Sequence, residues 1–132
     1  MENQSQRFVV NPDGTVADHQ LKLRWTQATV AKNVDVDEAE EVLKGLGEKF
    51  GGTWRFASVQ EMFSLVDHTH DEPAINTDIF PDTESDWYWT GTPTAWNKPA
   101  VWVVHFYLGL VRYGHRGVSG CLRAVSELPA GQ

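Results

Sequence analysis

The side chains best suited to recognise a ligand lie in the last third of the chain. Arg112, Tyr113, His115 and Arg116 form the one basic-aromatic concentration in an acidic protein. An arginine fork can bind an anion through paired hydrogen bonds, and an aromatic ring adds a face for stacking. These residues fit a small recognition patch for an anionic glycan or an acidic protein surface, although an ordinary hairpin surface also has this composition.

Two more aromatic residues extend this candidate surface. Trp96 stands in a loop bounded by Pro93 and Pro99, where it either plugs the core or projects as an exposed anchor. Tyr107 offers a large, stiff contact area at low entropic cost. We expect the surface to cover residues 91–99 and 107–119, and its expected binding residues are Trp96, Tyr107, Arg112, Tyr113, His115 and Arg116.

One segment concentrates residue types that bind metals, from Asp67 through His68 and His70 to Glu72. In an extended chain the two histidines would share a face, and a carboxylate could complete a site. Composition alone seldom makes a metal site, and a solvated polar loop after a helix accounts for the same residues. We therefore expect no metal and no cofactor.

The sequence lacks the common signatures of catalysis. It contains no G-x-S-x-G elbow, no glycine-rich phosphate loop and no H-E-x-x-H pair. Ser119 and His115 could pair as nucleophile and base, but nothing in their spacing favours this. Cys121 is the single cysteine, so an intrachain disulfide is impossible and a small buried apolar role is expected. We expect a protein that is not an enzyme.

Length and charge exclude several classes of protein. The chain has 132 residues, which suits one domain, and a formal net charge of -7. Such a surface repels phosphate backbones and anionic membranes, so neither nucleic acid nor membrane is an expected partner. The polar start of the chain resembles no secretory signal, so we expect synthesis in the cytoplasm.

Periodicity predicts two helices between groups of strands. Strands are expected at residues 7–10, 15–17 and 20–25, and apolar residues from Val36 to Phe50 recur at helical spacing behind the capping pair Asp35 and Glu38. A second capping box, Ser58 with Glu61, opens a helix whose apolar stripe runs from residue 59 to 66 and includes Met62 and Phe63 as core residues.

The remaining segments complete an α+β domain. Residues 67–85 are polar and form a long loop, which in a small domain is functional or pinned by its own packing. Strands are expected at 87–90, 101–107, 110–113 and 121–125, with a tight turn at Leu108 and Gly109. This order predicts helices packed on an antiparallel sheet, and Trp25, Trp54, Trp89 and Trp102 are expected in the core.

Four segments, in this order, resemble a known family. They are Arg7 and Phe8 with Asn11, Asp13–Val16, Asp18, Leu23 and Trp25; Thr53–Val59 with Glu61, Leu65, Val66 and Asp67; Pro73–Thr77 with Phe80, Pro81, Thr83 and Tyr88–Thr92; and Trp102–Phe106 with Gly109 and Arg123. Together they resemble the DUF1566 family, typified by the C-terminal domain of the Legionella collagen-like protein. The resemblance runs from about residue 7 to residue 126.

The resemblance implies a C-type-lectin-like fold, with a sheet joining the two termini, two helices and a long irregular loop region. It also implies a non-catalytic module of bacterial surface proteins or bacteriophage. Family members often carry two cysteines that this chain lacks, which suggests a version that folds in the cytosol. Calcium-dependent sugar binding is not expected, because Glu72-Pro73-Ala74 and Trp96-Asn97-Lys98 lack the oxygens that hold the ion.

These observations leave two functions open. The first is a recognition module that binds a glycan or a protein surface, in a phage particle or a bacterial surface assembly. The second is a stand-alone protein that docks on another protein inside the cell, as a structural component or an inhibitor. Both allow a homo-oligomer or a larger assembly. In either case we expect an arm at residues 1–6, one domain at 7–126 and a tail at 127–132.

Overall fold

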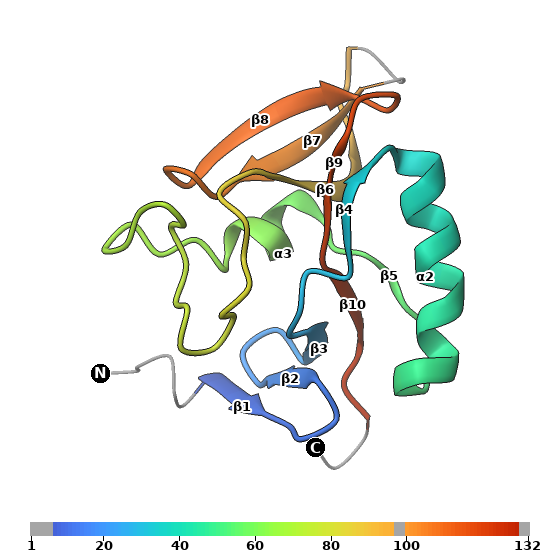
Figure 1. Ribbon diagram of the computed structural model, residues 1–132, viewed down its shortest axis with the longest axis vertical. Coiled ribbons are helices and arrows are strands. Elements are labelled where there is room, and N and C mark those ends of the chain that lie inside the picture. The colour runs from blue at the N-terminus through green and yellow to red at the C-terminus, as the bar shows by residue number, and fades with distance from the viewer. Residues whose placement is uncertain (1–6, 97–99, 130–132) are drawn as a thin grey trace.

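The computed structural model describes residues 7–96 and 100–129, which form two five-stranded sheets and two helices. Figure 1 shows one sheet at the bottom of the view, the other at the top and α2 along one side. The elements are β1 (Phe8–Val10), β2 (Thr15–Asp18), β3 (Leu23–Thr26), β4 (Ala31–Val34), α2 (Val36–Phe50), β5 (Arg55–Phe56), α3 (Val59–Phe63), β6 (Trp87–Pro93), β7 (Ala100–His105), β8 (Leu110–His115), β9 (Gly120–Leu122) and β10 (Ala124–Glu127).

The first sheet, which we call the terminal sheet, holds both ends of the described chain. Its strand order is β1-β2-β3-β10-β5, and every neighbouring pair is antiparallel. Asp18 fixes its first strands, because the carboxylate accepts hydrogen bonds from Arg7 at 2.8 and 2.9 Å and from the indole of Trp25 at 2.9 Å. Arg7 also donates to Ser64 at the end of α3, so this network joins the sheet to a helix.

The second sheet, which we call the hairpin sheet, has the order β4-β9-β6-β7-β8. Strands β6, β7 and β8 run antiparallel, whereas β6 and β9 are parallel at Tyr88 and Cys121. The expectation of one antiparallel sheet is therefore wrong in detail. The strand expected at residues 121–125 divides at Arg123 into β9 and β10, which belong to different sheets.

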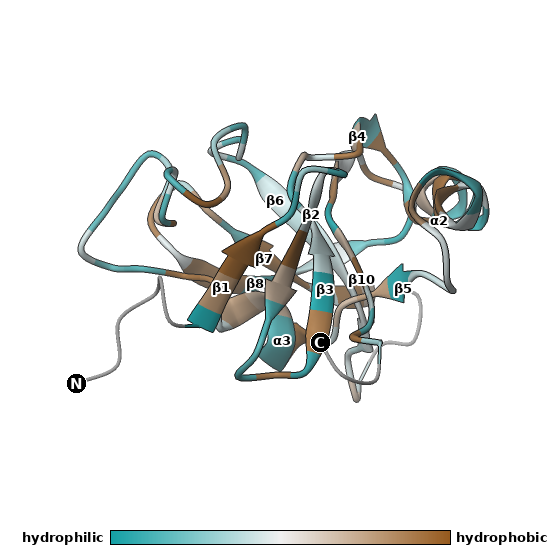
Figure 2. Ribbon diagram, turned by 90° about the horizontal axis from the view of Figure 1, so that it is seen from below, coloured by the Kyte–Doolittle hydropathy of each residue, from teal (hydrophilic) through white to brown (hydrophobic). Residues whose placement is uncertain are grey.

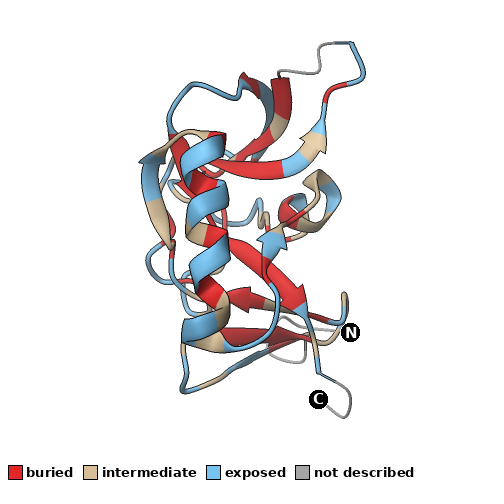
Figure 3. Cartoon of the chain, turned by 90° about the vertical axis from the view of Figure 1, so that its right-hand side faces the viewer, coloured by how far each residue is buried: buried red, intermediate tan, exposed pale blue. Residues whose placement is uncertain are grey.

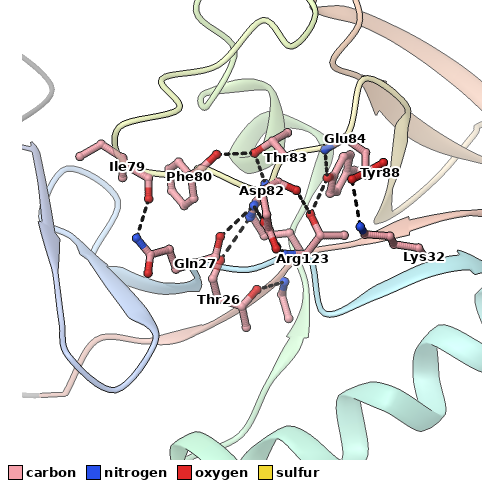
Figure 4. A network of polar contacts seen from close by, with 12 residues as sticks. Thr26, Gln27, Lys32, Ile79, Phe80, Asp82, Thr83, Glu84, Tyr88 and Arg123 are labelled. Atoms are coloured by element: carbon pink, nitrogen blue, oxygen red, sulfur yellow. Dashed lines mark hydrogen bonds and ion pairs between the residues drawn. The ribbon is translucent and has the colours of Figure 1, made fainter.

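Arg123 explains why the chain divides there. Its side chain is fully buried, and its guanidinium donates to the carbonyls of Thr26 and Gln27 at 3.1 and 2.9 Å and to the hydroxyl of Thr83 at 3.2 Å (Figure 4). The guanidinium also lies 4.8 Å from the ring centre of Phe80. A buried guanidinium needs several acceptors, and a break between two sheets exposes carbonyls that a continuous ladder would occupy.

The long loop at residues 67–86 is held by its own packing, as one of the two sequence interpretations proposed. Ala74, Ile75 and Phe80 are buried in the core. The Tyr88 hydroxyl accepts from the amide of Glu84 at 2.8 Å and shares a hydrogen bond with Thr29 at 2.6 Å. The Phe80 ring also packs edge to face on Phe8 of β1, so the segment is tied to both sheets and forms part of the rigid scaffold.

Both helices begin at the predicted capping boxes. Asp35 and Glu38 cap α2, and Ser58 and Glu61 cap α3, each through reciprocal side-chain and backbone hydrogen bonds. The capped α2 covers the predicted range and buries one face, and Figure 3 shows buried and exposed bands alternating along it. Figure 2, which looks nearly along α2, shows hydrophobic and hydrophilic residues on different sides of the helix.

The second helix is shorter than expected, since α3 ends at Phe63. Met62 is fully buried, but Phe63 is 40% exposed, so its assignment to the core is wrong. Phe63 follows the buried Met62 by one residue, which is about 100° around the helix, so it faces outward, where its ring packs on His68. Within the described residues no helix is long and apolar enough to cross a membrane.

Three of the four tryptophans expected in the core are buried there. Trp25 and Trp89 have no exposed surface and Trp54 has 6%. Trp102 is only half-buried, so its assignment to the core is wrong. Val104, on the same face of β7, is buried in the core, whereas the residues beside Trp102 on that face are Trp96 and its strand partner Tyr113, which are themselves exposed.

Candidate functional site

The β7–β8 hairpin carries most of the candidate surface. Six residue pairs join the strands, from Ala100 opposite His115 to His105 opposite Leu110, and Gly109 closes the turn with φ of 78°. Side chains alternate between the two faces of a strand. Tyr113 and Arg112 therefore project from opposite faces of β8, and the basic-aromatic group is divided between two surfaces.

The first surface is an aromatic cluster of Trp96, Trp102 and Tyr113. Trp102 and Tyr113 are direct cross-strand partners, and Trp96 folds over them with ring centres 5.5 and 5.6 Å away, both edge to face. Trp96 remains 62% exposed and Tyr113 56%. The open alternatives for Trp96 are thereby decided, because it covers Trp102 and still presents most of its ring to solvent.

The second surface surrounds Arg112. A hollow of about 140 Å³ is lined by Trp87, His105, Arg112 and Tyr113. Gly114 is buried below the Trp87 ring, and a Cβ there would lie 2.5 Å from an atom of that ring. Because Gly114 has no side chain, the indole of Trp87 can lie across β8. The flat face of this indole and the guanidinium of Arg112 therefore border the same hollow.

Charge is distributed unevenly along the chain. All 18 acidic residues lie outside residues 87–126, the segment that forms β6 to β9 and most of β10. Within the described residues, Arg112 has no ion pair and its side chain donates no hydrogen bond to the protein. The hairpin therefore presents an uncompensated cation on a protein whose net charge is -7.

Arg116 does not share this property. Its guanidinium forms ion pairs with Glu40 at 3.2 Å and Asp37 at 3.6 Å, and its carbonyl accepts the backbone N–H of Val36. These contacts fasten the end of the hairpin to the first turn of α2. His115 is exposed on β8, on the same face as Tyr113. Arg116 thus positions the hairpin, while Arg112 and His115 stay available on it.

Tyr107 lies away from the aromatic cluster. It sits in the turn after β7, where its carbonyl accepts from the amide of Glu72 at 2.9 Å. A hydrogen bond to the Glu72 side chain and the charge of that carboxylate raise the pKa of the Tyr107 hydroxyl. The structure therefore brings together Trp96 and Tyr113 and places Tyr107 at the opposite end of the hairpin.

The acidic and histidine-rich segment forms hydrogen bonds within itself and with the turn of the β7–β8 hairpin. Asp67 accepts hydrogen bonds from the hydroxyl and amide of Thr69, which lower the pKa of its carboxyl, and His68 contacts the carbonyl of Gly109 at 3.0 Å. In the part of the chain that the structure describes, no three His, Cys, Asp or Glu residues gather as metal ligands would. Asn97 and Lys98, which the calcium comparison used, lie outside the described residues.

Three residues of the site were absent from the expected binding set. Trp87, His105 and Trp102 contribute to the two surfaces, although the sequence indicated only strand residues there. A usable signal was Gly114, since a glycine inside a strand marks the close approach of another group. Cys121 is buried as expected, and burial raises the pKa of its thiol to about 11, which disfavours a reactive thiolate.

In a comparison with known protein families, one family model matches a range of the sequence that includes the whole β7–β8 hairpin. The family model described as the Lcl C-terminal domain matches residues 14–126. The match covers both helices, the long loop and both surfaces of the hairpin. No curated protein matches the chain.

Proposed function

Because the chain belongs to the Lcl C-terminal domain family, we propose that it is a non-catalytic binding module that recognises a protein or glycan surface without calcium. The observation that carries this proposal is the position of its exposed apolar side chains. Of the ten large hydrophobic residues that are exposed in the described part of the chain, seven lie in the segment from Trp96 to Val118. Exposed apolar groups concentrated in one place mark interaction sites more often than scattered ones do.

The composition of this surface fits recognition. Interfaces are enriched in tryptophan, tyrosine and arginine, which supply most of the binding energy in many complexes. Arg112 and Tyr113 stand on β8 of the hairpin, and the Trp96 ring, from the loop before β7, packs on Tyr113. That hairpin is held to α2 through Arg116 and to the long loop through Tyr107, so the surface is preorganised and little entropy is lost on binding.

The most deeply buried polar groups have structural roles, which supports a binding module over an enzyme. Arg123 is enclosed in a hydrogen-bond network at the junction of the two sheets. Asp18 is enclosed in a second network, with Arg7 and Trp25, that joins the first strands of the terminal sheet to α3. Neither network reaches the hollow beside Arg112. A general acid or base has to reach its substrate, so these enclosed groups are unsuited to that task.

A C-type-lectin-like fold remains part of the proposal. Its support is that both ends of the described chain join in the terminal sheet, that two helices follow the first strands, and that a long loop precedes the hairpin sheet. The proposed settings are a phage particle or a bacterial surface assembly. The second candidate is docking on another protein inside the cell. It is favoured by the aromatic residues of the surface, because tryptophan and tyrosine are enriched at protein–protein interfaces.

The test is a pull-down from bacterial lysate read by mass spectrometry. The double variant Trp96→Ala, Arg112→Ala should keep its fold, because both side chains are exposed, and should lose the partner. The matched control, Val10→Ala with Lys44→Ala, removes an exposed apolar and an exposed cationic group elsewhere and should retain it. Recovery of the same partner at the same yield from the first variant would refute this surface.

A further inference from the structure

Strand β8 forms an open edge of the hairpin sheet. It is the last strand in the order β4-β9-β6-β7-β8 and pairs only with β7 among the described residues. Figure 1 shows it at the outer margin of the molecule. Proteins usually protect such edges with prolines, lysines, bulges or covering segments. From Leu110 to His115 the strand has no proline, lysine or bulge, and five of its six residues are exposed.

The ladder shows which backbone groups face outward. Phe106 donates its N–H to Asp86, beside the first residue pair of β6 and β7, so residues 106, 104 and 102 face β6. Alternate residues face opposite edges, and residues 105, 103 and 101 therefore bond to their β8 partners at 110, 112 and 114. The backbone groups of Val111, Tyr113 and His115 point away from the sheet.

Among the residues that the structure describes, nothing pairs with the outward backbone groups of two of these three residues. The carbonyl of His115 accepts from Val118 at 3.1 Å, but the described residues provide no hydrogen bond to the outward groups of Val111 or Tyr113. Their side chains are 40% and 56% exposed. An added strand would satisfy the N–H and C=O of both residues and would cover apolar surface at the same time.

Alternation also fixes what such a strand should carry. Residues opposite Val111 and Tyr113 would lie on the face of the aromatic cluster, where apolar side chains gain contact area. The residue between them would lie on the other face, beside Arg112 and the hollow with Trp87 and His105. A guanidinium without an ion pair there favours a carboxylate, since an arginine fork matches carboxylate geometry.

We propose that the outer edge of β8 binds an extended segment of a partner protein as an additional strand, with the residue pattern apolar, acidic, apolar. The absence of acidic residues from 87–126 makes this edge complementary to an acidic segment, although the rest of the protein is acidic. This inference rests on the proposed binding function and narrows it to a polypeptide partner recognised through its backbone.

Amide exchange measured by NMR tests the inference. The probe is a short capped peptide of alternating valine and glutamate, and its control carries lysine for glutamate. The acidic peptide should slow exchange at Val111 and Tyr113 and leave Arg112 unchanged, because the Arg112 amide already bonds to β7. The lysine peptide should have no effect, and the charge reversal Arg112→Glu should exchange these preferences.

A pair of variants separates the backbone from the side chain. Val111→Pro removes the outward N–H, which an edge strand tolerates, whereas Val111→Ala shortens the side chain and keeps that N–H. One hydrogen bond corresponds to about fivefold to tenfold in affinity, so the proline variant should bind the acidic peptide weaker than the alanine variant by about that factor. Circular dichroism and melting curves confirm that both variants fold.

Several outcomes would overturn the inference. They are unchanged exchange at both amides with millimolar peptide, equal binding by the two Val111 variants, and equal binding of the lysine peptide. Exchange that slows with protein concentration alone would assign the edge to a second copy of the chain. If an acidic polysaccharide binds while amide exchange at Val111 and Tyr113 stays fast, the ligand of this surface would be a glycan. If the pull-down loses its partner but these amides never change, the binding module stands and strand addition fails.

Discussion

Gly114 lies directly beneath the indole ring of Trp87, so close that a Cβ at this glycine would stand 2.5 Å from Cζ3 of that ring. Gly114 has no positive φ, and its requirement is therefore space and not backbone conformation. The contact sets the orientation of Trp87, which lines the hollow beside Arg112. A glycine on the edge strand thus determines the shape of the candidate site.

The first prediction follows from this contact. Gly114→Ala should destabilise the protein by about 1–3 kcal/mol, as overpacking of a filled site does, and should change tryptophan fluorescence. Gly117→Ala is the control, because a Cβ at Gly117 meets nothing within 4 Å and its φ is ordinary. Chemical denaturation measures both. Equal stability of the two variants would contradict the close contact.

The second prediction compares tryptophans on neighbouring strands. Trp89→Ala should cost about 3–5 kcal/mol, because its ring has no exposed surface and its indole N–H donates to Val34 at 2.8 Å. Trp102→Ala should cost less than half of that, since Trp102 is half-buried and packs on exposed rings. Urea denaturation of both variants checks the order, and a larger loss for Trp102 would contradict the observed burial.

Local signals predicted the helices well. The capping pairs at Asp35 and Ser58 mark the helix starts because they depend on residues only three positions apart. The same is true of the β7–β8 hairpin, whose turn at Gly109 needs a left-handed residue. These elements could be predicted because the interactions that define them lie within a few residues along the chain.

The division into two sheets could not be predicted in this way. Residues 121–125 look like one continuous strand, and the break depends on acceptors for Arg123 at Thr26, Gln27 and Thr83, all distant in sequence. The candidate site shows the same limit. Arg112 and Tyr113 are adjacent in sequence, yet strand alternation turns their side chains to opposite faces of β8. Arg112 lies beside Trp87 at a hollow that Tyr113 also borders, and the Tyr113 ring packs on Trp96.

The third prediction concerns metal. A chelator should leave the melting temperature unchanged, because His68 contacts the carbonyl of Gly109 and the segment around it holds no cluster of three ligands among the described residues. Differential scanning fluorimetry with EDTA, followed by excess Ca²⁺ or Zn²⁺, measures this. A melting temperature that falls by several degrees and recovers with either ion would show that a metal stabilises the folded state.

The fourth prediction is a pH dependence set by Asp18. Burial raises the pKa of this carboxyl, but hydrogen bonds from Arg7 and Trp25 and the charge of Arg7 together lower it below the ordinary 3.8. A carboxyl with a depressed pKa in the folded state stabilises the protein above its unfolded pKa. This contribution is lost as the pH falls from about 3.8 through the folded pKa.

Asp18→Asn should therefore be less stable than the unmodified protein at neutral pH, and the difference should shrink as the solution becomes more acidic. Asp78→Asn, a change at an exposed carboxyl, is the control and should show no such convergence. Urea midpoints measured between neutral pH and pH about 3 decide the matter. A difference that stays constant across that range would mean that Asp18 acts through its shape and not through its charge.

The fifth prediction tests whether Arg123 holds the long loop as well as the junction of the sheets. Arg123→Lys keeps the charge but loses the fork that reaches Thr26, Gln27 and Thr83, and the buried carbonyls would lose their donors. Unsatisfied buried polar groups cost about 1–3 kcal/mol each, so we expect a loss of several kcal/mol. Arg55→Lys, at an exposed guanidinium paired with Glu61, should cost less than about 1 kcal/mol.

The position of the damage distinguishes this role from a general loss of stability. Because Arg123 contacts Thr83 and the ring of Phe80, the lysine variant should become sensitive to proteases first within residues 67–86. Limited proteolysis with mass spectrometry locates the first cut under conditions where the protein is still folded. A first cut in α2 or in the β7–β8 hairpin, with the loop intact, would show that the hydrogen bonds of Thr29 to Asp82 and of Tyr88 to Glu84 hold the loop without Arg123.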